Sequence, residues 1–230
     1  VGKKYWISDN SDVNRAFPGN PEGQATSRIA AAVMDHVKDY AYGIQFASFY
    51  MPGDFIPHVR MMETGYQSAS LANLFGLQYV VTAEPRAYDK ATLNYNWQIG
   101  GTEAFSVYSG VTEKIDSESA SHAVSAVLRF LTRMGIIRYN CHAGYISTVL
   151  DEEELLSVKS DKSGGFLKRF VSPGDEVVRG NVIANVINPM TGEIAADIYA
   201  PTDGIIFYAQ NAPMIYQNSV VFKLIRRLHN

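Results

Sequence analysis

The sequence is poor in cysteine and contains no long hydrophobic run. Its 230 residues include a single cysteine, Cys141. One cysteine excludes an internal disulfide framework and a cysteine-rich metal site. No apolar run approaches the roughly 20 residues that a membrane-spanning helix needs, and no secretory signal stands at the start. These absences make a reducing, soluble, cytoplasmic setting the default expectation.

An excess of charge of one sign is also missing. Lysine and arginine number 20 against 23 acidic residues, for a formal net charge of -3. Nucleic acids and anionic membranes select strongly basic surfaces, so neither is expected as a partner. The composition is instead that of a soluble globular protein, with 47% hydrophobic residues. A chain of this length can form one large domain or two modest ones, each with its own core.

Residues 1–138 alternate between helical and strand patterns. Helices are expected at 22–40, 64–76 and 116–135, and strands at 43–49, 77–82 and 102–108. The glycines at 76 and 135 are typical helix stops. Strands separated by helices predict a mostly parallel sheet with helices on its faces. The first domain is therefore expected to be α/β.

Residues 139–230 have a different pattern, with short apolar runs interrupted by turn signals. The strings Ser172-Pro-Gly-Asp175 and Ala200-Pro-Thr-Asp-Gly204 are examples. This pattern predicts a small all-β barrel or sandwich. Segments 170–186 and 198–207 resemble the two halves of a lipoyl- or biotinyl-type barrel, but the hairpin between them, 188–192, has no lysine. A structural or substrate-gating barrel is therefore favoured over a swinging-arm carrier.

The most specific segment lies directly before the first predicted helix. It reads Asp12-Val-Asn14-Arg15-Ala-Phe-Pro-Gly19, and this string resembles the signature of the succinylglutamate desuccinylase/aspartoacylase family, relatives of the zinc carboxypeptidases. The planar fork of Arg15 matches a substrate carboxylate, and Asn14 adds a neutral donor beside it. The alternative is a turn in which the side chains of Asp12 and Asn14 satisfy nearby backbone groups.

Two further segments extend the resemblance along nearly the whole chain. Pro57-His-Val-Arg60 is similar to a Pro-x-Val-Arg stretch of the family, and 101–110 falls where the family has the strand that bears its general-base glutamate. The resemblance implies a zinc carboxypeptidase-like fold whose N-terminal strands are missing here, and hydrolysis of N-acyl amino acids. It also implies a set of substrate-binding residues, which here are Asn14, Arg15, Arg60 and, from a loop of the β domain, Tyr216.

The zinc site implied by the resemblance is incomplete in this chain. Family members use an early His-x-x-Glu pair and a later histidine in an Asp-(Ile/Leu)-His segment, which leaves one position for the attacking water. The early pair would precede Val1, and a first residue other than methionine is expected of a processed, trimmed or partial gene product. The later histidine position is occupied by Phe46, or by Ala47 if the alignment slips by one. Neither side chain coordinates zinc, so this chain alone is not expected to bind the metal.

The general base is replaced as well. Tyr108 occupies the position expected for the glutamate. A tyrosine with a pKa of about 10 is a poor general base at neutral pH. Glu103 is nearby, but its odd offset from Tyr108 places it on the opposite face of a regular strand. His58 is the histidine closest to the site along the sequence.

Three functions remain open. The first is a non-catalytic homologue or subunit that keeps the scaffold and binds a carboxylate, which the replacements at Phe46 and Tyr108 favour. The second is an active zinc hydrolase whose metal site is completed by an N-terminal segment or a companion chain. Such a partner would cover the exposed strands of an incomplete sheet. The third is a binding module that uses the β barrel.

Overall fold

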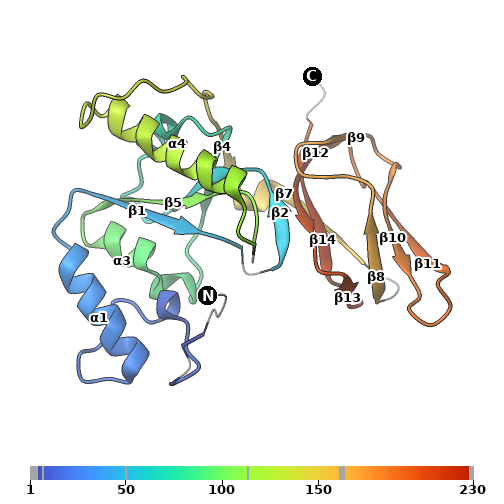
Figure 1. Ribbon diagram of the computed structural model, residues 1–230, viewed down its shortest axis with the longest axis horizontal. Helices are drawn as coiled ribbons and strands as arrows, with labels where there is room; N and C mark the ends of the chain where they lie inside the picture. The colour runs from blue at the N-terminus through green and yellow to red at the C-terminus, as the bar shows by residue number, and fades with distance from the viewer. Residues whose placement is uncertain (1–4, 7, 50, 113, 161–163, 228–230) are drawn as a thin grey trace. The chain divides into compact units, whose positions relative to one another are not determined.

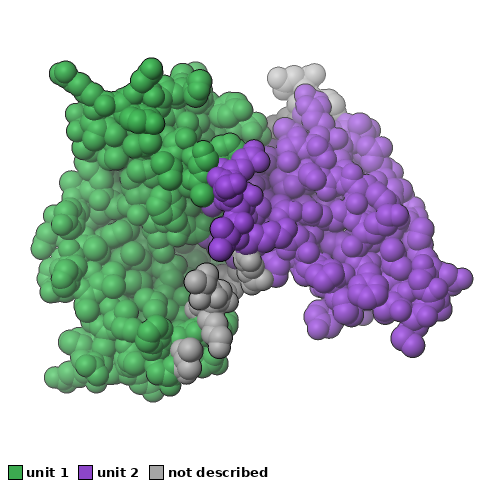
Figure 2. Space-filling view, viewed as in Figure 1, with its two compact units in different colours: residues 1–47, 57–108, 120–150 green, residues 48–56, 109–119, 151–230 purple. Residues whose placement is uncertain are grey.

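The computed structural model describes residues 5–6, 8–49, 51–112, 114–160 and 164–227. The chain divides into two compact units, shown in different colours in Figure 2. The α/β unit comprises 1–47, 57–108 and 120–150, and the β unit comprises 48–56, 109–119 and 151–230. The β unit therefore includes two short segments from the first half of the sequence.

The α/β unit is built on a five-stranded sheet with the order β1-β5-β3-β4-β6. Its strands are β1 (Tyr42–Ala47), β3 (His58–Met62), β4 (Tyr79–Ala83), β5 (Glu103–Tyr108) and β6 (Thr148–Asp151). β1 pairs with β5 and β3 pairs with β4 in parallel, whereas β3 pairs with β5 in the antiparallel sense. β3 runs opposite to β1 because no crossover helix lies between them, and a parallel connection needs one.

The described residues form four α-helices and four short 3-10 helices, of which η4 belongs to the β unit. They are α1 (Ala25–Val37), α2 (Ala69–Ala72), α3 (Leu93–Ile99), α4 (Ser117–Arg133), η1 (Val13–Arg15), η2 (Asn73–Phe75), η3 (Asp89–Ala91) and η4 (Glu152–Glu154). α4 lies on one face of the sheet and α3 on the other (Figure 1). None of the helices in the described ranges is long and apolar enough to span a membrane.

The ends of α4 agree with the sequence expectation. The Asp116 carboxylate accepts a hydrogen bond from the Ser119 N–H at 2.8 Å, and Gly135 has a left-handed φ of 72°. The helix expected at 64–76 is shorter, because regular helix begins only after Ser68, whose hydroxyl accepts from the Leu71 N–H at 3.4 Å. Its predicted glycine stop is confirmed, since Gly76 has a φ of 65°.

The core of the α/β unit lies between α4 and the sheet. Phe75, Phe105 and Phe130 are fully buried, and their ring centroids are 4.5 to 5.5 Å apart. Val59 and Val107 belong to the same cluster. Because side chains alternate across a strand, the residues between these positions point to the other face of the sheet. The packing of one face therefore decides which residues are presented on the opposite one.

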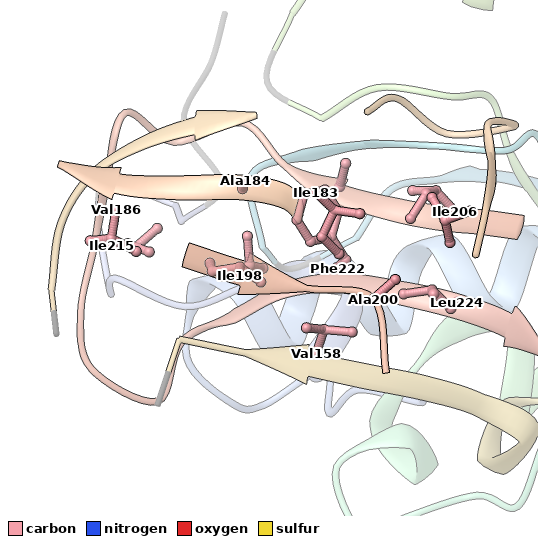
Figure 3. Packing of buried hydrophobic residues seen from close by; sticks show 13 residues of the cluster. Val158, Ile183, Ala184, Val186, Ile198, Ala200, Ile206, Ile215, Phe222 and Leu224 are labelled. Carbon is pink, nitrogen blue, oxygen red and sulfur yellow. The ribbon is translucent and has the colours of Figure 1, made fainter. Parts of the chain in front are cut away.

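The β unit contains two sheets, ordered β11-β10-β8-β13 and β2-β12-β14-β7, with β9 paired to β12. Its strands are β2 (Gly53–Phe55), β7 (Leu155–Lys159), β8 (Gly165–Arg169), β9 (Glu176–Val177), β10 (Val182–Ile187), β11 (Ile194–Tyr199), β12 (Gly204–Gln210), β13 (Met214–Ile215) and β14 (Val220–Arg226). Buried side chains from both sheets, among them Ile183, Val186, Phe222 and Leu224, form one core (Figure 3). This arrangement is a small β-sandwich.

The hairpin between β10 and β11 is closed by its own backbone. The Asn188 N–H donates to the Glu193 carbonyl at 2.8 Å, and the Gly192 N–H donates to the Asn188 carbonyl at 2.9 Å. Gly192 has a φ of 73°, a left-handed conformation that glycine adopts without strain. Met190 is 89% exposed at the tip. The position at which a carrier domain would present a lysine therefore presents a thioether.

Candidate functional site

The register of the sheet places three polar side chains in one row. Gln45 of β1 is aligned with Ser106 of β5, and Ser106 is aligned with Arg60 of β3. We call Gln45, Ser106 and Arg60 the polar row. They lie on the face opposite α4, because their neighbours Val59 and Val107 point into the core beneath that helix. Ser106 is buried, while Gln45 and Arg60 are half-buried.

The next row toward the end of β5 contains Ala47, Tyr108 and His58. The His58 ring stacks on the Tyr108 ring with centroids 4.8 Å apart and planes at 17°, and His58 is 1% exposed. Tyr79 is aligned with His58 on β4, and burial raises the pKa of its phenol. Tyr79 therefore stays neutral at physiological pH. This row is a packed aromatic layer at the edge of the polar row.

Helix α3 covers the polar face of the sheet. The Gln98 side chain donates from Nε2 to the Met62 carbonyl at 3.2 Å, which anchors the end of the helix on β3. A Cβ added at Gly43 would lie 2.6 Å from the Trp97 ring, so the indole packs directly on the backbone of β1. The Trp97 Nε1 donates to the Val37 carbonyl at 3.0 Å. The helix is thus held in place along its length.

Asn94 lies on the same side of α3 as Gln98, one turn earlier. A tight turn joins α3 to β5, so the helix runs antiparallel to that strand. Four helical residues rise about 6 Å and two strand residues about 6.6 Å. Since Gln98 bonds to the Met62 carbonyl, these rises put Asn94 at about the level of Arg60, two residues earlier on β3.

The Asn94 side chain has an uncommon environment. Asn94 is 3% exposed, and neither its amide oxygen nor its amide nitrogen has a hydrogen-bond partner among the described residues. The Gln98 Oε1 atom is also buried without a hydrogen-bond partner among the described residues. A buried polar group without a partner costs about 1–3 kcal/mol, so native proteins rarely keep one without a function. The amide of Asn94 is therefore a candidate ligand-binding group.

The segment that carries the family signature forms a turn next to the start of α3. The Asp12 carboxylate accepts from the Asn14 N–H at 2.9 Å, so the local turn expected as an alternative is present. Asn14 also reaches across the unit, because its Oδ1 accepts from the Leu93 N–H at 3.1 Å. Leu93 is the first residue of α3. The signature turn is therefore attached to the helix that covers the polar row.

Arg15 lies at the end of the same turn. Its guanidinium carbon is 5.8 Å from the centroid of the Tyr88 ring, and its NH1 donates to the Asn14 carbonyl at 2.8 Å. A guanidinium in this position is attracted by the electron-rich face of the ring. Arg15 and Asn14 thus lie on η1, whereas Arg60 comes from β3.

Two other residues singled out in the sequence lie elsewhere. Phe46 is aligned with Val107, which places it on the α4 side of the sheet, and it is 59% exposed. Ala47, and not Phe46, is aligned with Tyr108. Tyr216 belongs to the β unit, where it follows β13, is 82% exposed and donates its N–H to the Ser219 hydroxyl at 3.0 Å.

The residues at the strand ends do not fit a zinc ion. A catalytic zinc needs three protein ligands drawn from histidine, carboxylate or thiolate side chains. The row at the end of β5 offers an alanine, a tyrosine and one histidine that is stacked and buried. In the part of the chain that the structure describes, no group of three or more His, Cys, Asp or Glu residues could hold a metal. No step of chemistry through zinc is therefore assigned to these residues.

Four residues of this site were missed in the sequence, namely Gln45, Asn94, Gln98 and Ser106. No helix was expected at 93–99, although signals for one exist. The Thr92 hydroxyl is an N-cap that accepts from the Tyr95 N–H at 3.3 Å, and Gly100 ends the helix. Two amides spaced four apart in such a helix share one face. Ser106 carries no signal of its own, because only the register pairs it with Arg60.

No family model and no curated protein matches the sequence. Among solved structures, a succinylglutamate desuccinylase from Silicibacter sp. TM1040 is 20% identical with a TM-score of 0.78, covering 95% of this chain and 68% of that chain. The chain has the fold of the succinylglutamate desuccinylase/aspartoacylase proteins. The resemblance read from the signature segment is thereby confirmed.

Two further structures with this fold agree. The product-bound ectoine utilization protein EutE (DoeB) from Ruegeria pomeroyi is 16% identical with a TM-score of 0.80, covering 98% of this chain and 70% of that one. A succinylglutamate desuccinylase/aspartoacylase from Rhodobacter sphaeroides is 16% identical with a TM-score of 0.78, covering 99% and 71%. The TM-scores establish the desuccinylase/aspartoacylase fold. The sequence identities are too low to transfer an activity to this chain.

Replacing Asn94 with leucine is expected to raise the free energy of unfolding by about 1–2 kcal/mol, because a buried amide without a partner is exchanged for an apolar group of similar size. Asn96 is the matched control on the same helix. It is 7% exposed, and its Nδ2 donates to the Lys90 and Thr92 carbonyls at 3.0 and 2.8 Å. Asn96→Leu should therefore destabilise the protein. Urea denaturation of both variants measures the two changes in the free energy of unfolding, which should be opposite in sign. A loss of stability in Asn94→Leu would contradict the statement that the Asn94 amide has no partner.

Proposed function

We propose that this chain is a non-catalytic relative of the zinc amidohydrolases that binds a small N-acyl amino acid through its carboxylate and does not hydrolyse it. The observation that supports this proposal is the polar row, in which Arg60 lies on the face of the sheet that α3 covers, together with the buried, unpartnered amide of Asn94 on that helix. In the described residues the adjacent row offers one histidine, which is too few for a zinc site. On this proposal the chain keeps carboxylate binding and does not itself supply the groups that activate water.

The chemistry of the row matches that class of ligand. An N-acyl amino acid carries an anionic carboxylate and a neutral amide. The Arg60 guanidinium offers a planar pair of donors for the carboxylate. The Asn94 side chain offers one donor and one acceptor, which is the complement of an amide. Arg15, next to the start of α3, would hold a second carboxylate of an acidic ligand.

Hydrolysis requires a nucleophile that these residues do not supply. Water attacks an amide at neutral pH when a metal ion or a general base of suitable pKa activates it. The row nearest the polar row ends in Ala47 and Tyr108, and the one imidazole there is stacked on Tyr108. Neither metal activation nor base activation is available from these groups.

Calorimetric titration with N-succinylglutamate tests this proposal, followed by assay of succinate release with and without added zinc. We expect saturable binding and no release in either condition. The trimethyl ester of the same compound is the control, and it should not bind because it lacks the carboxylates. Zinc-dependent release of succinate would show an active hydrolase. Equal affinity for the acid and its ester would rule out carboxylate recognition.

A second candidate is a zinc hydrolase that a companion chain or an N-terminal segment completes. It is favoured by the edge strand β1, where Phe46 is 59% and Tyr42 38% exposed. An apolar edge strand of this kind is usually covered by another strand. Metal analysis of the protein from its native source, with identification of co-purifying chains, separates the candidates. Stoichiometric zinc would support the second candidate, and its absence would support the first.

A further inference from the structure

The four-stranded sheet of the β unit has an apolar outer face. The face is formed by β11, β10, β8 and β13, in that order. Its exposed large side chains are Phe166 (42%), Phe170 (49%), Ile194 (62%), Tyr199 (52%) and Met214 (53%). The outward face of a solvated antiparallel sheet is normally polar. A contiguous apolar face on a soluble protein is typical of an interaction surface.

The strand register organises these side chains into rows. Met214 is aligned with Phe166, Phe166 with Ile187, and Ile187 with Ile194, so one apolar row crosses all four strands. Leu167, Val186 and Ile215, the neighbours of Phe166, Ile187 and Met214, pack in the core of the sandwich. On β11 the register shifts between Val186 and Ile187, which puts Ile194, 62% exposed, on the outer face although Ala196 packs inward. The row therefore points outward on every strand.

The adjacent row is charged and changes sign across the face. Lys168 of β8 is aligned with Asn185 of β10, and Asn185 with Asp197 of β11. The Asn185 Nδ2 and the Tyr199 hydroxyl donate to the Asp197 carboxylate at 2.6 and 3.2 Å, which holds the carboxylate in place. The Lys168 Nζ lies 5.7 Å from the centroid of the Phe170 ring. Lys168 and Asp197 are two strand spacings apart, about 10 Å, on either side of Asn185.

This pattern is self-complementary. A two-fold axis along β10, between two outer faces packed about 10 Å apart, places β8 of one copy opposite β11 of the other. Lys168 then faces the partner's Asp197, and Asp197 faces the partner's Lys168. The same operation sets Phe166 opposite the partner's Ile194 and Phe170 opposite the partner's Tyr199. Charges pair with opposite charges, and apolar side chains meet apolar side chains.

We propose that the outer face of this sheet is the interface of a homodimer, with Asn185 near the two-fold axis. A second copy fits this face better than an unrelated partner, because the charged and apolar groups of β8 and β11 find their complements at the symmetry-related positions. An unrelated protein would have to supply the same alternation of charge and apolar groups by coincidence. The proposal concerns the β unit alone and does not depend on ligand binding by the α/β unit.

Sedimentation equilibrium of the 230-residue chain tests this inference. We expect a mass of twice the 25.4 kDa of one chain. Lys168→Glu should weaken dimerisation at least tenfold, because two carboxylates then face each other at each end of the row. The double variant Lys168→Glu/Asp197→Lys should restore the dimer, since the charges are exchanged and still opposite. Lys114→Glu, at an exposed lysine outside this sheet, makes the same change of charge and should leave dimerisation unchanged.

Circular dichroism and thermal unfolding establish that each variant is folded before its mass is interpreted. A chain that is monomeric at every concentration would overturn the proposal. So would a dimer that persists in both Lys168→Glu and Phe166→Ser. A dimer that Phe46→Lys dissociates and Lys168→Glu does not would assign the interface to the edge strand β1. Failure of the double variant to restore a dimer that Lys168→Glu had lost would refute the charge pairing.

Discussion

Replacing Phe130 with alanine is expected to lower the free energy of unfolding by about 3–5 kcal/mol. The ring is fully buried, and its centroid lies 4.5 Å from that of Phe75 and 5.5 Å from that of Phe105. The Tyr42 ring meets it edge-on at 5.9 Å. Its removal takes apolar area out of the core and leaves a cavity that α4 and the sheet cannot close, because both elements are rigid.

Tryptophan fluorescence during urea denaturation measures this loss of stability, because it reports the unfolding of the α/β unit. Both tryptophans of the chain, Trp6 and Trp97, belong to the α/β unit. Val124→Ala is the matched control, because Val124 lies on the same helix and is 55% exposed. It should change the stability by about 0.5 kcal/mol or less. If Phe130→Ala cost no more than Val124→Ala, the packing of α4 on the sheet would be wrong.

Replacing Arg60 with methionine is expected to weaken the binding of N-succinylglutamate by a factor of about 100. Hydrogen bonds to charged groups contribute about 1.5–3 kcal/mol each, and 1.4 kcal/mol corresponds to a factor of 10. Methionine keeps the apolar stem that packs on the sheet, so the fold should be retained. Arg60 is half-buried beside Ser106, which makes the guanidinium the principal charge of the polar row.

The same calorimetric titration measures this effect. Arg60→Lys should recover only part of the affinity, because an ammonium keeps the charge but loses the planar fork. Arg28→Ala, at an exposed position on α1, should bind as the unchanged protein does. An Arg60→Met variant that is folded and binds with unchanged affinity would exclude the polar row as the carboxylate site.

Much of the fold was predictable because its longest elements carry strong local signals. The strands β1, β4 and β5 lie within one or two residues of the predicted ranges, and α4 begins and ends at its predicted cap and glycine. Helix α3 was missed because its buried face carries amides in place of apolar side chains, which hides the helical period. The antiparallel pairing of β3 with β5 left no local signal either.

The site was predictable only in part. The signature segment indicated Asn14 and Arg15, and Pro57-His-Val-Arg60 indicated Arg60, without showing how the two segments meet. In the structure Asn14 bonds to the first residue of α3, the helix that covers Arg60. Asn94 is a candidate because its amide is buried without a hydrogen-bond partner. Burial of that kind arises only when the α/β unit packs, so the sequence does not reveal it.

The amino-acid sequence by itself determined which side chains stand at the ends of β1 and β5. Ala47, Phe46 and Tyr108 are the same residues in any conformation, and none of them is a histidine or a carboxylate. Tertiary structure alone decided which side chains act together. Ser106 is aligned with Arg60, and Lys168 and Asp197 flank Asn185 in one row, through the register of separate strands. That register is set by the burial of the opposite face of each sheet, because a slip of one residue would turn every core side chain outward.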